Sequence, residues 1–190
     1  MNYPQYTNII QICFLPDIEL AMPEQMYEFV NKLNNGKIYK TVLNSNLCWE
    51  TIMDLYISIC ASNHDIPVLH LDTHGGKNVG FVKDPSNPVD IITWDRLVTK
   101  ITELNQVSNG QLFLSLNICE GLYIYNNLSN NVYPLSLKTI GSFDNVLANE
   151  GKIRFTSMYT EYFTSFDMNK AVSTFFSQNP PRKAGRFALI

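Results

Sequence analysis

The chain has 190 residues, of which 45% are hydrophobic and 16% are charged, and its formal net charge at pH 7 is −3. This length and composition predict one globular domain over residues 1–190 with a sizeable core, and they exclude a disordered chain. Because no stripe of basic residues is visible, we expect no nucleic-acid partner.

The hydrophobic runs of the sequence are short. None is long enough to cross a bilayer, so we expect no membrane partner. Residues 1–5 lack the basic start and the apolar stretch of a signal peptide, which makes the cytoplasm the expected location.

Strand and helix signals alternate from the start of the chain. Residues 8–15 form an apolar run that predicts a buried strand, and residues 38–43 predict a second strand. Between them, Pro23 and Glu24 favour the start of a helix that Asn35-Gly36 ends. The predicted inner face of this helix consists of Met26, Phe29, Val30 and Leu33.

Two further helices flank the next strand. Asn46 is expected to cap a helix with an apolar face of Cys48, Ile52, Leu55, Tyr56 and Ile59. Pro67 leads into a strand that ends at His74, and residues 77–90 predict an excursion with a small hairpin arm at 79–82. Thr93 is expected to cap a helix whose inner residues are Trp94, Leu97, Val98, Ile101 and Leu104.

The rest of the chain repeats this pattern, although residues 123–131 give no clear signal because asparagine-rich turns dominate their end. Residues 111–118 and 137–141 predict two strands, and residues 186–190 predict an edge strand. A helix is expected at 153–163, with Met158, Tyr159 and Phe163 on its inner face. A second helix is expected to be capped by Asp167 and ended by Pro180-Pro181, and its inner residues are Ala171, Val172, Phe175 and Phe176.

This alternation predicts an α/β fold with three layers, in which a mostly parallel sheet carries helices on both faces. Right-handed crossovers place the carboxyl ends of successive strands at one edge of the sheet. Ligands of such sheets bind outside those ends. The residues that follow each strand are therefore the candidates for a functional site.

Two strand ends carry reactive side chains. One strand runs into His74 and then Gly75-Gly76, and another runs into Cys119, Glu120 and Gly121. A thiolate is a strong nucleophile and an imidazole transfers protons near neutral pH. The glycines let a substrate carbonyl approach the backbone, where the amides of Gly75 and Cys119 are candidates for an oxyanion hole.

These motifs resemble the caspase-like cysteine peptidases, the group of caspases, metacaspases, clostripain-type enzymes and CHAT domains. The group has one apolar strand that ends in His-Gly and another that ends in a turn containing cysteine. The similarity to CHAT domains is closer, because His70 stands four residues before His74 and Cys119 is followed by glutamate. Residues 91–97 and the late helix pair also resemble the family, so that about residues 65–177 are covered.

The resemblance implies a caspase-like fold and a site with defined roles. Cys119 would be the nucleophile, His74 its acid–base partner, and the amides of Gly75 and Cys119 the oxyanion hole. Asn117 stands where the family lines its primary specificity pocket, and its neutral side chain leaves the preference between acidic and basic substrates open. Glu120 either lines the cleft as a substrate-binding residue or faces water.

The other cysteines and histidines have less specific interpretations. Cys13, Cys48 and Cys60 are expected to be buried free thiols, and no metal-ligand spacing or cofactor motif is visible. His70 is expected to pack with a hydrogen bond, and Asp72 to be an ordinary polar residue of the strand.

The sequence thus predicts a cysteine endopeptidase that cleaves protein or peptide substrates through Cys119 and His74. The short chain favours control by a regulatory protein partner. One alternative is a catalytically silent caspase-like module that binds a protein partner. Another is a different α/β hydrolase or transferase that uses the same cysteine.

Overall fold

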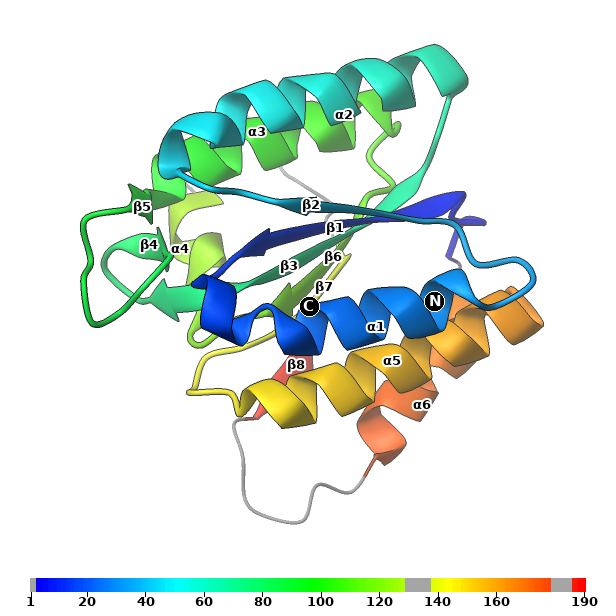
Figure 1. Cartoon of the computed structure of the whole chain (residues 1–190). Helices are drawn as coiled ribbons and strands as arrows, with labels where there is room; N and C mark the ends of the chain where they lie inside the picture. The colour runs from blue at the N-terminus through cyan, green and yellow to red at the C-terminus, as the bar shows by residue number, and fades with distance from the viewer. Residues whose placement is uncertain (1–2, 129–137, 179–185) are drawn as a thin grey trace.

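A computed structural model describes residues 3–128, 138–178 and 186–190. It is an α/β fold in which one mixed, mostly parallel sheet lies between two layers of helices (Figure 1). The strands of this sheet are β1 (Asn8–Phe14), β2 (Ile38–Val42), β3 (Pro67–Gly76), β4 (Gly80–Val82), β5 (Ile91–Ile92), β6 (Phe113–Asn117), β7 (Lys138–Ser142) and β8 (Phe187–Leu189).

The main path of the sheet runs in the order β2-β1-β3-β6-β7-β8. The pairs from β2 to β7 are parallel, and β8 joins the edge antiparallel to β7. Strand β4 folds back antiparallel on the end of β3, and β5 pairs with β4. The parallel strands therefore end at one edge, beside β4 and β5, where β1 and β3 point in Figure 1.

Helices α2 (Trp49–Asn63) and α3 (Trp94–Val107) cover one face of the sheet, with the short α4 (Ile124–Leu128) near its edge. Helices α1 (Ala21–Asn31), α5 (Ala148–Ser165) and α6 (Met168–Ser177) cover the other face. Each face has its own hydrophobic cluster, because successive strand residues point to opposite faces. Single turns of 3-10 helix, η1 (Asp17–Glu19), η2 (Asn46–Cys48) and η3 (Gly121–Tyr123), complete the described elements.

The predicted strands are confirmed to within one or two residues at most ends, and so is the hairpin arm. The Asp167 cap is confirmed, since its carboxylate accepts hydrogen bonds from the amides of Asn169 and Lys170. All five predicted inner residues of α3 are buried. The start at Leu137, the end of the stretch 123–131 and Pro180-Pro181 lie outside the described residues.

The predicted face of α2 was right only for Tyr56. The buried residues are Trp49, Met53, Tyr56 and Cys60, whereas the predicted Leu55 is 54% exposed. Both stripes of this helix are apolar, so that periodicity alone did not select the one that packs on the sheet. Ser45, and not Asn46, caps the preceding turn by accepting a hydrogen bond from the Leu47 amide.

Two predicted core residues on the other face were also wrong. Phe29 and Phe176 are 49% and 41% exposed. Each adjoins a residue that is buried, Val30 or Phe175, and successive helix residues point about 100° apart. Helix α5 begins at Ala148, five residues before the predicted start at 153. The earlier start was missed because Gly151, in the first turns of the helix, weakens the helix signal of the sequence.

No helix in the described ranges is both long enough and apolar enough to span a membrane.

Candidate active site

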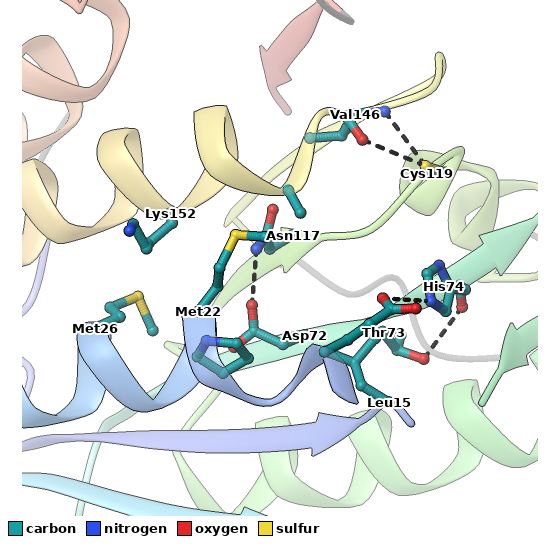
Figure 2. Close-up of a pocket in the computed structure, with 13 residues that line it drawn as sticks. Leu15, Met22, Met26, Asp72, Thr73, His74, Asn117, Cys119, Val146 and Lys152 are labelled. Atoms are coloured by element: carbon teal, nitrogen blue, oxygen red, sulfur yellow. Dashed lines mark hydrogen bonds and ion pairs between the residues drawn. The ribbon is translucent and has the colours of Figure 1, made fainter. Parts of the chain in front are cut away.

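A cavity of about 90 Å³ lies at the edge where the parallel strands end (Figure 2). Its wall combines residues at or just after the ends of β1, β3, β6 and β7 with residues of α1 and α5. The lining residues are Leu15, Glu19, Met22, Pro23, Met26, Asp72, Thr73, His74, Asn117, Cys119, Val146, Ala148 and Lys152. His74 and Cys119, predicted from separate motifs, therefore face one cavity.

His74 is held at the end of β3 by its neighbours. The Thr73 hydroxyl donates to the Phe14 carbonyl oxygen at 2.8 Å, which ties the ends of β1 and β3 together. The Nε2 atom of His74 lies 2.9 Å from a carboxylate oxygen of Glu19, which is an ion-pair distance, although the angle is not that of a hydrogen bond. The imidazole is 28% exposed and so remains accessible from the cavity mouth.

Cys119 lies in the turn between β6 and η3. The next residue, Glu120, has a left-handed backbone with φ of 55°, an uncommon conformation for a residue other than glycine. The sulfur accepts a hydrogen bond from the Val146 amide at 3.3 Å and lies 3.7 Å from the Val146 carbonyl oxygen. In this structure the thiol thus contacts the segment after β7, and Figure 2 shows it at the same end of the cavity as His74.

Two contacts bring the histidine and cysteine motifs together. Gly75 packs so closely on the cysteine turn that a Cβ atom there would overlap the Cys119 carbonyl oxygen. The Lys77 amide donates to a carboxylate oxygen of Glu120 at 2.8 Å. Only glycine fits the first contact, which explains a glycine directly after the histidine.

The floor of the cavity is a buried polar network centred on Asp72. One carboxylate oxygen accepts from Asn117 Nδ2 at 2.7 Å, and the other accepts from Gln11 Nε2 at 2.8 Å and lies 3.2 Å from His70 Nε2. His70 Nδ1 in turn lies 2.7 Å from the Tyr159 hydroxyl on α5. The sheet register explains the cluster, since His70 pairs with Gln11 and Asp72 pairs with Asn117 on the neighbouring strands.

The network keeps Asp72 ionised. Burial by itself raises the pKa of this carboxyl group, but the charge and hydrogen bond of His70 and the hydrogen bonds from Gln11 and Asn117 outweigh it and hold the pKa below its usual value. The predicted hydrogen-bonded packing of His70 is thereby confirmed. Asp72 has more contacts than the ordinary strand residue that we expected.

The four thiols differ in their surroundings. All are free, with Cys13 and Cys60 buried and Cys48 and Cys119 partly buried. Burial raises the pKa of the Cys60 thiol to about 11, and burial together with the Asp72 charge raises the pKa of Cys13 further. The expected burial of Cys48 was wrong, because this residue lies in the turn that precedes α2 and packs only at the rim of the core.

Asn117 lines the cavity, whereas Glu120 is not among the lining residues and accepts a hydrogen bond from the Lys77 amide. Sequence reasoning missed Glu19 and Val146. Both follow strands of the parallel sheet, but neither belongs to a motif, and only the fold brings them to the cavity. Within the described ranges, no three His, Cys, Asp or Glu residues are grouped to hold a metal ion.

No protein-family model matches the sequence, and no curated protein matches it significantly.

Proposed function

We propose that this chain is a caspase-like cysteine endopeptidase that cleaves peptide bonds through Cys119 and His74. The observation that carries the proposal is the cavity at the carboxyl edge of the sheet, which both side chains line. The close packing of Gly75 on the cysteine turn supports it, because it fixes the backbone of the two motifs relative to each other. Open α/β sheets bind their ligands at this edge.

The reaction begins when His74 takes the proton of the Cys119 thiol. The thiolate attacks the scissile carbonyl carbon, a C–S bond forms, and the negative charge moves to the carbonyl oxygen. The amides of Gly75 and Cys119 are the proposed donors to this oxyanion. When the oxyanion collapses, the C–N bond breaks and the leaving amine takes the proton from the imidazolium. His74 then removes a proton from water, which attacks the thioester and releases the acid and the thiol.

The substrate would reach the thiol from the cavity. Asn117 and Asp72 form the polar floor, and Met22, Met26 and Pro23 of α1 form an apolar wall. A peptide side chain that enters here loses water contact on its sides and meets polar atoms at its tip. Specificity in the proposed enzyme therefore resides in the floor, and a regulatory protein partner would act on access to it.

One observation favours a second function, a silent binding module. The Cys119 thiol lies against the Val146 backbone, within 3.3 Å of its amide nitrogen and 3.7 Å of its carbonyl oxygen, so that the proposed nucleophile has another partner in this structure. Such a module would keep the cavity for a segment of a partner protein without hydrolysing it.

A fluorogenic peptide library distinguishes the two functions. The wild-type protein, Cys119→Ala and His74→Ala are incubated with the library, and Cys48→Ala is the control for loss of a thiol outside the cavity. Cleavage by the wild type and by Cys48→Ala, absent from the other two variants, supports the peptidase. Binding of the same peptides by all four proteins without cleavage supports the module.

A further inference from the structure

Three adjacent strands deliver three chemically distinct groups to one cavity. Glu19 follows β1 in the turn η1, His74 lies near the end of β3, and Cys119 follows β6. In the sheet, β3 lies between β1 and β6. The His74 imidazole, on the middle strand, therefore lies between the Glu19 carboxylate on one side and the turn that carries Cys119 on the other. Neither sequence motif includes Glu19.

The position of Glu19 is fixed by its backbone. The turn η1 starts directly after Pro16, and the Glu19 amide donates to the Pro16 carbonyl oxygen at 2.9 Å. Thr73, next to His74, bonds the Phe14 carbonyl at the end of the same strand. The carboxylate and the imidazole are consequently attached to two strand ends that are bonded to each other, which holds the 2.9 Å pair at the cavity mouth.

We infer that Glu19 is a positioning residue for His74. Its carboxylate attracts the Nε2 side of the ring and leaves Nδ1, which makes no hydrogen bond within the described ranges, as the atom that takes the Cys119 proton. When that S–H bond breaks and the Nδ1–H bond forms, the imidazolium lies beside a negative charge that stabilises it. The inference rests on the proposed roles of His74 and Cys119.

The other charged residues that line the cavity do not cancel this effect. Apart from Glu19, the charged residues that line the cavity are Asp72 and Lys152. The Asp72 carboxylate accepts hydrogen bonds from Gln11 and Asn117 and lies beside His70. The Lys152 ammonium group donates a hydrogen bond to Gln25 on α1. Figure 2 shows Lys152 at the opposite end of the cavity from His74. Glu19 is thus the cavity carboxylate that contacts the imidazole.

The test uses the alkylation rate of Cys119 by iodoacetamide, because this rate reports thiolate formation and needs no peptide substrate. Peptide mapping by mass spectrometry follows each thiol separately in the wild type, Glu19→Gln, Glu19→Asp, His74→Ala and Asp17→Asn. Asp17 is the matched control, since it is an exposed acidic residue of the same turn outside the cavity lining. Cys48 is the internal reference in every sample.

Glu19→Gln is expected to slow Cys119 labelling about fivefold, the scale of one partly exposed ion pair. Glu19→Asp, which keeps the charge on a shorter side chain, is expected to give an intermediate rate, and Asp17→Asn the wild-type rate. The Cys48 rate is expected to be constant. Once a cleaved peptide is known, Glu19→Gln should lower kcat and leave KM unchanged.

The outcomes separate this inference from the proposed function. If His74→Ala slows labelling and Glu19→Gln does not, or Glu19→Gln accelerates it, the positioning role is wrong and the pairing of His74 with Cys119 stands. If both variants slow labelling but no peptide is ever cleaved, the positioning role stands and the peptidase function is wrong. Equal rates in all five proteins overturn both.

Discussion

Gly75, directly after the proposed acid–base residue, packs against the backbone of Cys119, and no side chain fits between them. The contact joins the end of β3 to the turn after β6, and the bond from Lys77 to Glu120 closes the same junction. These two contacts, together with the pairing of β3 and β6, set the relative position of the two motifs.

Gly75→Ala should disrupt this junction. The new methyl group would overlap the Cys119 carbonyl oxygen, and the enforced shift of the two segments should cost roughly 1–3 kcal/mol of unfolding free energy, as overpacking does. Urea denaturation measures this loss, and Cys119 labelling should slow in parallel. Gly76→Ala is the control, because its Cβ would meet only a methyl group of Val79, at 3.0 Å, and this exposed side chain has room to shift. Equal stability of the two variants contradicts the close packing.

The thiols should react in an order that follows burial. Cys13 and Cys60 are buried, and burial raises the pKa of both, to about 11 for Cys60. Iodoacetamide near pH 7 should therefore label Cys48 and Cys119 in the native protein and spare the other two until it unfolds. Within the first pair, the proposed function predicts that Cys119 reacts faster and that His74→Ala removes the difference. Faster labelling of Cys48 in the wild type would argue against an activated Cys119.

The order of the strands and helices, and the edge of the sheet at which the candidate site lies, could be predicted because strand and helix periods are local properties of the sequence. The site could be predicted only in part, since His74 and Cys119 stand in recognisable strand-end motifs. Glu19 and Val146 follow other strands without a motif, and their proximity arises from the parallel register of β1, β3, β6 and β7. The buried face of α2 could not be predicted for a different reason, because either of its apolar stripes satisfies the helical period.

Stability should depend on pH through Asp72. Burial raises the pKa of this carboxyl group, but His70, Gln11 and Asn117 lower it to a net value below the usual one, whereas the unfolded chain recovers a pKa of about 4. The ionised carboxylate therefore contributes stability that is fully present above about pH 4 and is lost as the pH falls through the lower folded-state pKa. Denaturant midpoints between pH 2 and pH 7 measure this loss.

Asp72→Asn should remove the loss of stability that occurs in the wild type as the pH falls, and it should lower the stability at pH 7. Its amide group would place a donor against the donors of Gln11 or Asn117, which should cost roughly 1–3 kcal/mol for an unsatisfied buried group. Asp17→Asn, in an exposed turn, is the control and should keep the wild-type pH profile. A variant at Asp72 with an unchanged profile would show that this carboxyl group does not carry the pH dependence.

The Val146 amide should support the thiolate of Cys119. It donates to the sulfur at 3.3 Å, and a hydrogen bond to a charged acceptor is stronger than one to a neutral thiol. Val146→Pro removes this N–H in a segment without regular secondary structure, and Val146→Ala keeps it. We expect Val146→Pro to slow Cys119 labelling about tenfold, the effect of one bond to a charged group, and Val146→Ala to leave the rate close to that of the wild type. Faster labelling in Val146→Pro would show instead that the segment shields the thiol, which is the behaviour expected of the silent binding module.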